Sequence, residues 1–197
     1  ADIVTSSLTK WIVGSGNVMA GAVQLVKSSK FYGELKAFFD DDCGESRSKL
    51  YAQDAAVLDE GSKDFNERMK PVNSAAQNVV DFLLNHDAVE QVWYPSIDTK
   101  NFYHKVKTEN GGYGGLLSFT LKNDKKAAKF FDHLRVSKGP SFGTEFSLAC
   151  PYTLLAHYDE LEWAEGCGVS RNLIRLSVGT EGKQDLITRF NEAFDSI

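Results

Sequence analysis

The sequence predicts an α/β protein whose C-terminal part is an α+β domain, with helices packed on a mainly antiparallel sheet. Three observations support this fold class. Strand-like and helix-like segments alternate after residue 87. The strand-like runs are short, rich in branched or aromatic residues, and followed by proline, glycine or a polar residue. The last helix-like segment carries its apolar residues on one face, as expected for a helix that covers a sheet.

The elements of the C-terminal part follow from hydrophobic spacing and from turn residues. The segment Asn110–Gly115 contains four glycines, and we interpret it as a turn that leads into a strand. A proline follows the two strand candidates that end at Tyr94 and at Cys150. We expect strands at residues 89–94, 116–121, 147–150 and 173–178, and helices at residues 125–134 and 185–194.

The N-terminal part predicts two short strands and three helices. We expect strands at residues 2–5 and 22–26, and helices at residues 29–39, 45–58 and 63–84. The acidic run 40–44 is interpreted as a turn between the first two helices. Pro71 falls inside the apolar stripe of the third helix. We expect that helix to bend or restart there, because proline has no amide hydrogen and its ring clashes with the preceding turn.

Composition and charge exclude several classes of protein. Of the 197 residues, 42% are hydrophobic and 25% are charged. These values are close to the globular average and argue against a disordered or fibrous chain. No apolar run approaches the ~20 residues needed to cross a bilayer. The net charge of −5 gives no support to nucleic-acid binding, which usually requires a basic surplus, so we expect no nucleic-acid or membrane partner.

The cysteines are few and odd in number. Cys43, Cys150 and Cys167 form no C-x-x-C pair. A disulfide framework and a cysteine zinc site are therefore not expected, and the reducing cytoplasm is the expected location. The sequence also shows no basic segment followed by an apolar one, as a secretory signal would. We expect each cysteine to be a small buried or half-buried apolar residue.

Several familiar site motifs are absent from the sequence. The segment Gly14–Asn17 is not part of a P-loop, and Met19 stands where a G-x-G-x-x-G motif needs its third glycine. The four histidines lack H-E-x-x-H spacing, and no G-x-S-x-G elbow is present. We therefore interpret Gly14–Asn17 as a flexible turn, and we expect no metal.

Lys10 is the first candidate functional residue. It follows the first predicted strand in the tetrapeptide Ser7-Leu8-Thr9-Lys10. The lysine amine could form a Schiff base with the aldehyde of pyridoxal 5′-phosphate. The hydroxyls of Ser7 and Thr9 could donate hydrogen bonds to the phosphate of the same cofactor. A solvent-facing lysine after a turn is the commoner role for such a tetrapeptide, and this alternative stays open.

Arg175 is the second candidate. It lies inside the apolar strand predicted at residues 173–178. A cation in such a strand is costly to bury unless an anion accompanies it. The carboxylate of an amino-acid substrate is one suitable partner, since guanidinium binds carboxylates through two parallel hydrogen bonds. An internal salt bridge to Asp or Glu is the alternative, and periodicity alone slightly favours it.

Four segments in order along the chain carry a resemblance to a known family. They are Ser7–Lys10 followed by Gly14 and Gly21, Gly112–Phe119, Ser141–Glu145 and Leu173–Glu181. Together they resemble the cofactor-lysine segment, the glycine turn, the Ser-Leu-Gly-Gly-x-Glu segment and the C-terminal signature of the Cys/Met-metabolism family of pyridoxal-phosphate-dependent enzymes. That family includes cystathionine γ-synthases, cystathionine lyases and homoserine sulfhydrylases. Residues 14–19 and 139–158 look most like its fungal γ-synthase-like branch.

The resemblance implies a fold and a set of roles. The fold would be that of the aspartate-aminotransferase-like, fold type I enzymes. Residues 1–62 would be the end of the large cofactor domain, residues 63–86 a connecting helix and residues 87–197 the small C-terminal domain. The roles would be the catalytic Schiff-base lysine for Lys10, phosphate binding for Ser7 and Thr9, and binding of the substrate α-carboxylate for Arg175 helped by Ser141.

The resemblance also implies a reaction. In the γ-synthase branch, an O-acylhomoserine and cysteine give cystathionine by γ-replacement. Three positions depart from the family pattern: Gly14–Asn17 stands for Gly-His-Ser-Asp, Pro140 for an acidic residue, and Glu60 for an arginine. A cystathionine lyase or an O-acetylhomoserine sulfhydrylase therefore stays an alternative. A non-catalytic regulatory or assembly homologue, which belongs to another functional class, also stays an alternative.

The family pattern further suggests that this chain is the C-terminal fragment of a longer enzyme. The family's aspartate that pairs with the pyridine nitrogen, and its tyrosine that stacks on the ring, lie upstream of the lysine. We therefore expect the isolated fragment to be inactive. The full-length protein would bind small amino-acid substrates and form a homodimer or homotetramer.

Overall fold

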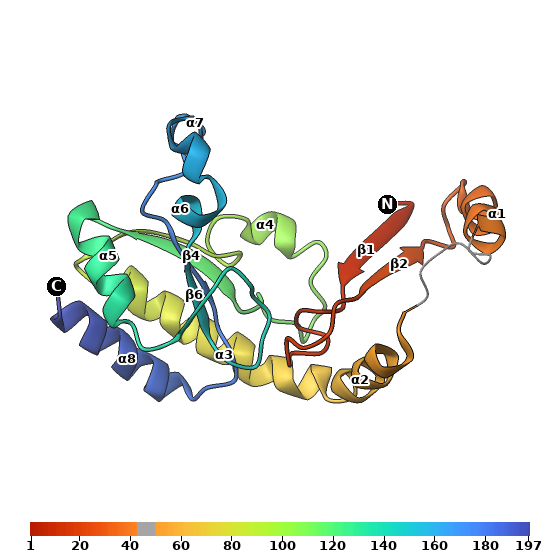
Figure 1. Cartoon of the computed structure of the whole chain (residues 1–197), viewed down its shortest axis with the longest axis horizontal. Helices are drawn as coiled ribbons and strands as arrows, with labels where there is room; N and C mark the ends of the chain where they lie inside the picture. Colours follow the sequence, from red (N-terminus) through yellow and green to blue (C-terminus); the bar gives the residue numbers. More distant parts are fainter. Residues whose placement is uncertain (43–49) are drawn as a thin grey trace. The chain divides into compact units, whose positions relative to one another are not determined.

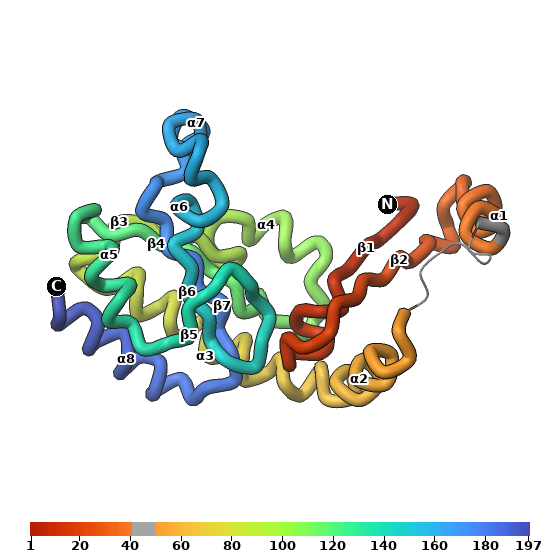
Figure 2. Tube along the Cα trace, viewed as in Figure 1, coloured from red at the N-terminus to blue at the C-terminus, as the bar shows by residue number. Residues whose placement is uncertain are grey.

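The computed structural model of the chain describes residues 1–42 and 50–197. Two compact units follow each other along the chain, Ala1–Phe65 and Asn66–Ile197 (Figure 1, Figure 2). Cys43 and residues 45–49 of the second predicted helix lie outside the described residues. The assignment of residues 1–62, 63–86 and 87–197 to parts of a larger enzyme stays a prediction.

The N-terminal unit begins with a hairpin. Strand β1 (Ile3–Ser7) pairs antiparallel with β2 (Gly21–Leu25), in the register that joins Ile3 to Leu25 and Ser7 to Gly21. This confirms both predicted strands. Helix α1 (Tyr32–Asp42) continues through residues 40–42, so the predicted turn is wrong there. An ion pair between Lys36 and Asp40, four residues apart, supports the extra turn of helix.

A small core joins the loop 8–20 to helix α2 (Ala52–Ser62). Val13 and Val18 from the loop are buried with Leu58 from the helix. A Cβ atom added at Gly61 would lie 3.0–3.3 Å from three atoms of Val13, so the helix backbone lies directly against the loop. These contacts give the loop after β1 a fixed position on helix α2. The helix starts at Ala52, later than predicted.

The C-terminal unit is built on a five-stranded sheet in the order β3-β4-β7-β6-β5. Every pairing is antiparallel except that of β5 with β6. The predicted mainly antiparallel sheet is therefore confirmed, with β7 at its centre. The strands are β3 (Val89–Trp93), β4 (Leu116–Leu121), β5 (Ser137–Lys138), β6 (Leu148–Pro151) and β7 (Ile174–Ser177).

Three helices share one core with this sheet: α3 (Phe65–Leu84), α5 (Asp124–His133) and α8 (Lys183–Asp195). At its centre the rings of Phe119, Phe130 and Phe190 contact one another with centroids 5.8–6.1 Å apart, and all three are fully buried. In Figure 1 the strands lie between α3 and α8 below and the short helices α6 and α7 above. The helices thus bury the sheet face that carries Phe119.

The helices differ from the sequence prediction in two respects. Helix α3 runs through Pro71 without a break, so the predicted restart is wrong. The proline removes one hydrogen bond, and the buried residues that follow it hold the later turns on the sheet. Four short elements, α4 (Lys100–Tyr103), α6 (Tyr152–Ala156), η1 (Tyr158–Glu160) and α7 (Leu161–Gly166), are too short for hydrophobic periodicity to reveal. Within the described ranges, no helix combines the length and apolar character of a bilayer-crossing segment.

The packing around Phe190 predicts a stability effect. Phe190→Ala would leave a cavity among Phe82, Phe119 and Phe130, and we expect it to lower the free energy of unfolding by about 3–5 kcal/mol. The matched control is Phe102→Ala, because the Phe102 side chain is 72% exposed and its loss should change the same quantity by less than about 0.5 kcal/mol. Urea unfolding followed by fluorescence measures both. Equal effects of the two substitutions would contradict this core.

Candidate functional site

Lys10 lies in a tight turn directly after β1. The N–H of Gly14 donates to the carbonyl oxygen of Lys10 at 2.9 Å and closes the turn. Gly14 has a φ of +74°, which a side chain would disfavour, and it is buried. The Lys10 side chain is half-buried. The backbone of the lysine is therefore fixed by its own turn, in the loop that packs on α2.

Hydrogen bonds of Thr9 connect this turn to Ala20, at the other end of the loop 8–20. Its Oγ1 accepts a hydrogen bond from the N–H of Ala20 at 2.9 Å, and the N–H of Leu8 donates to the carbonyl of Ala20 at 2.9 Å. The Thr9 hydroxyl also donates to the carbonyl oxygen of Ala20; the distance between the two oxygens is 3.3 Å, so this hydrogen bond is long. A phosphate oxygen could therefore replace that acceptor at little cost. Sequence patterns gave no signal for Ala20, because it acts through its main chain.

Ser7 is the exposed last residue of β1, opposite Gly21. Its hydroxyl makes no hydrogen bond with any residue that the structure describes. The tetrapeptide thus carries an amine and two hydroxyl donors within four residues. This donor set fits the aldehyde and the phosphate of pyridoxal phosphate, while its function in binding stays a prediction.

Arg175 lies in the central strand β7, on the sheet face opposite the core shared with α3, α5 and α8. Its neighbours Ile174 and Leu176 point into the core, so Arg175 points to the opposite face. Its cross-strand partners are Ser118 on β4 and Cys150 on β6. The half-buried guanidinium is therefore supported by strands on both sides.

The partners of Arg175 are carbonyl oxygens and aromatic rings. Nη2 donates to the carbonyl oxygen of Pro140, and to that of Ser141 at 3.2 Å. Cζ lies 5.3 Å from the ring centroid of Phe142 and 5.1 Å from that of Tyr152. Both distances are within the range of cation–π attraction. Sequence reasoning assigned no role to either ring, although both lie within residues 139–158, which it had identified as similar to the family.

No Asp or Glu in residues 1–42 or 50–197 forms an ion pair with Arg175. The alternative of an internal salt bridge is therefore wrong for the described part of the chain. The Nε and Nη1 hydrogens of Arg175 also make no hydrogen bond to a described residue. The cation thus keeps its positive charge and has N–H donors left at Nε and Nη1, so it can form a charge-assisted hydrogen bond to a carboxylate.

Residues 139–147, which we name the 139–147 loop, bring Ser141 next to Arg175. The N–H of the buried Gly143 donates to Oγ of Ser177 at 2.9 Å, and Gly143 has a φ of +77°. The structure thus brings together Ser141 and Arg175 within the C-terminal unit. Lys10, Ser7 and Thr9 form the other group, within the N-terminal unit. The roles of all five residues stay predictions.

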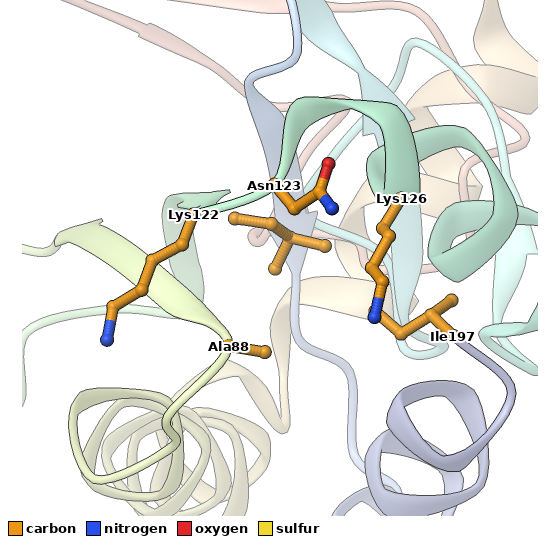
Figure 3. Close-up of a pocket in the computed structure, with 6 residues that line it drawn as sticks. Ala88, Lys122, Asn123, Lys126 and Ile197 are labelled. Atoms are coloured by element: carbon orange, nitrogen blue, oxygen red, sulfur yellow. The ribbon is translucent and has the colours of Figure 1, made fainter.

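Other features of the C-terminal unit lie apart from Arg175. A pocket of about 140 Å³ at the start of α5 is lined by Ala88, Leu121, Lys122, Asn123, Lys126 and Ile197 (Figure 3). Both of its lysines are exposed. In the described residues, no cluster of three or more His, Cys, Asp or Glu side chains could hold a metal ion.

The glycine turn before β4 is held by Asn73 and Tyr94. The N–H of Gly114 donates to Oδ1 of Asn73 at 2.8 Å, and the Tyr94 hydroxyl donates to the carbonyl of Gly114 at 2.7 Å. A Cβ atom at Gly112 would lie 2.1 Å from Cγ of Asn73, so only glycine fits there. Burial raises the pKa of the Tyr94 hydroxyl, which therefore stays protonated and keeps donating.

The fold places the chain among pyridoxal-phosphate enzymes. It is similar to the crystal structure of cystathionine γ-lyase from Lactobacillus plantarum complexed with L-serine, with a TM-score of 0.84 and 28% identity. It is also similar to cystathionine γ-synthase from Xanthomonas oryzae in complex with cystathionine, with a TM-score of 0.82 and 25% identity. Each match covers 100% of this chain and 51% of the other. The predicted fold class is confirmed.

The family model described as Cys/Met metabolism PLP-dependent enzyme matches residues 1–195, so the chain belongs to this family. The cystathionine γ-synthases of Neurospora crassa and Saccharomyces cerevisiae are 44% and 42% identical to it, over 98% and 99% of its length. These matches cover 31% and 32% of the relatives. The chain therefore spans about a third of the length of these curated relatives. A cystathionine γ-lyase of Bacillus subtilis is 31% identical over 100% of this chain and 51% of its own length.

The surroundings of the two described cysteines predict different reactivities. Cys150 is 2% exposed, and burial raises the pKa of its thiol although the Arg175 cation opposes this rise. Cys167 is exposed. At pH 8 we expect iodoacetamide to modify Cys150 at least about tenfold more slowly than Cys167, because the thiolate is the reactive form. Peptide mass spectrometry measures both rates. Urea should remove the difference, and equal native rates would contradict the burial of β6.

Proposed function

We propose that the full-length protein catalyses a γ-replacement, in which an O-acylhomoserine and cysteine give cystathionine and the free acid. Two relatives that are 44% and 42% identical to this chain carry the name cystathionine γ-synthase, which supports this choice of reaction. The observation that carries the proposal is the guanidinium of Arg175, which has carbonyl and ring partners and two donor groups left over. An amino-acid substrate offers the carboxylate that matches it.

In this proposal Arg175 binds the substrate α-carboxylate and fixes the orientation of the substrate. Ser141 assists from the same loop that holds Nη2 of the arginine. The rings of Phe142 and Tyr152 lie 5.3 and 5.1 Å from Cζ of the guanidinium and stabilise its charge by cation–π attraction.

Lys10, Ser7 and Thr9 are the proposed cofactor-binding residues. The hydroxyls of Ser7 and Thr9 donate to the phosphate, and the Lys10 amine binds the cofactor aldehyde covalently. When bound, pyridoxal phosphate supplies an electron sink for the charge that develops at the substrate α-carbon. After the substrate has displaced it, the Lys10 amine would take the α-proton, release that proton, and only then take a β-proton, so that the γ-substituent can leave.

Pro140 supports a second candidate reaction. Its ring has no group that donates or accepts a proton, and its carbonyl is already engaged with Arg175. A relative 31% identical to this chain is named cystathionine γ-lyase, so cleavage of cystathionine or sulfhydrylation of an acylhomoserine is the alternative within the family. We further propose a cytoplasmic homodimer or homotetramer, with the isolated chain inactive, by analogy with the family.

The proposed role of Lys10 can be tested by trapping. In the full-length protein loaded with pyridoxal phosphate, borohydride reduction should attach a pyridoxyl group to Lys10, read by peptide mass spectrometry. Lys10→Ala should lose the modification and the activity, whereas Lys27→Ala, at an exposed lysine of the same unit, should keep both. A wild-type protein with no modified Lys10 would favour the non-catalytic homologue.

The proposed role of Arg175 predicts a specific kinetic defect. Arg175→Ala should raise KM for the amino-acid substrate on the order of 100-fold, since charge-assisted hydrogen bonds contribute about 1.5–3 kcal/mol each. The control is Arg171→Ala, which removes an exposed ion pair with Glu165 in the same unit and should leave KM unchanged. Initial-rate kinetics measure KM, and circular dichroism checks the fold. An unchanged KM in a folded Arg175→Ala variant would refute substrate binding by this residue.

A further inference from the structure

The carboxylate of Glu181 is bound to a single residue of the 139–147 loop. Its Oε1 accepts the N–H of Ser147 at 2.6 Å, and its Oε2 accepts the Ser147 hydroxyl at 2.8 Å. Oγ of Ser147 in turn accepts the N–H of Gly179 at 3.0 Å. Ser147 is 1% exposed, so these hydrogen bonds are sheltered from water. Glu181 therefore fixes the end of the loop that leads into β6.

Two more residues at the end of β7 and just after it, Ser177 and Thr180, also bind the 139–147 loop. Both the N–H and the hydroxyl of Thr180 donate to the carbonyl of Glu145, at 2.7 and 2.9 Å. Oγ of the buried Ser177 accepts the N–H of Gly143 at 2.9 Å. A Cβ atom at Gly179 would lie 2.4 Å from the carbonyl oxygen of Glu145, so the two backbones are in direct contact. Residues 177–181 thus hold the loop from Gly143 to Ser147.

The opposite end of this loop supplies the carbonyl groups that hold Arg175. Nη2 of Arg175 is bound to the carbonyls of Pro140 and Ser141. A shift of the loop would therefore shift these two acceptors and rotate the guanidinium. Since binding sites require their groups within about 0.5 Å of the productive geometry, even a small shift weakens carboxylate binding. The loop connects the Glu181 carboxylate to the guanidinium without direct contact between them.

We propose that Glu181, acting through Ser147, is a positioning residue for Arg175, and that Ser177 has the same role at Gly143. This inference rests on the proposed function, because it requires Arg175 to bind the substrate carboxylate. Glu181 touches no substrate itself. Its substitution should therefore change the affinity for a carboxylate-bearing ligand and leave the binding of a ligand without a carboxylate nearly unchanged.

Glu181→Gln is the most informative substitution. Glutamine has the same size and keeps one acceptor oxygen, but its amide group is a donor that faces a donor of Ser147. Ser177→Ala is a second variant that removes only the acceptor for Gly143 and changes no charge. The matched control is Glu192→Gln, because Glu192 also pairs with an arginine, Arg135, but lies on α8.

The experiment uses the full-length protein loaded with pyridoxal phosphate. L-serine and ethanolamine differ only in the carboxylate, and each is titrated while the cofactor absorbance is followed. Glu181→Gln and Ser177→Ala should weaken L-serine binding about tenfold, weaken ethanolamine binding less than twofold, and raise KM more than they lower kcat. The absorbance spectrum without ligand should stay as in the wild type. Glu192→Gln should bind both ligands as the wild type does.

Three outcomes would overturn the proposal, and they separate it from the proposed function. Unchanged L-serine binding in both variants overturns the positioning role alone. Equal weakening of both ligands does the same, since it indicates a general loosening of the unit. A wild type that binds L-serine and ethanolamine equally overturns the carboxylate role of Arg175 together with this inference. If Glu181→Gln fails to fold, Ser177→Ala gives the result.

Discussion

The C-terminal unit depends on how it accommodates one cation in its central strand. Arg175 alternates with Ile174 and Leu176, whose side chains belong to the core shared with the helices. Strand β7 cannot place Arg175 on the core face without exposing Ile174 and Leu176, because side chains alternate strictly along a strand. The guanidinium must therefore lie on the other face, where the 139–147 loop and the rings of Phe142 and Tyr152 meet it.

The choice of partners decides what this cation can do. A carboxylate partner would neutralise the charge and occupy the planar edge of the guanidinium. Main-chain carbonyls carry only partial charge, so two of them satisfy Nη2 and leave the net charge for a ligand. The nearby carboxylates are engaged elsewhere, since Glu181 binds Ser147 and Glu145 lies 3.6 Å from the guanidinium of Arg68. These two carboxylates are thus bound to Ser147 and to another arginine and not to Arg175.

The sequence predicted the elements whose side chains show a period, and missed what depends on the main chain. The strands at β4 and β7 and the helix at α8 have clear apolar patterns, and all three are present. Elements of four to six residues, such as α6 and α7, are shorter than a pattern needs. The family motifs indicated Ser141 and Arg175, but periodicity favoured a salt bridge. The true acceptors are carbonyl groups of residues 140 and 141, and every residue has a carbonyl, so no side-chain pattern could reveal them.

The two candidate residues are held in different ways, and this difference suits the proposed division of work. The guanidinium of Arg175 is held by two carbonyls and two rings, so it keeps one orientation, as substrate binding requires. Lys10 has a backbone fixed by the Gly14 hydrogen bond and by the Thr9–Ala20 contact, but its amine stands on a flexible four-carbon stem. A proton carrier must reach more than one substrate atom, and a fixed backbone with a flexible stem allows this. In the proposed division of work, a guanidinium held by carbonyls and rings suits the orientation of a substrate, and a long side chain on a fixed backbone suits proton transfer.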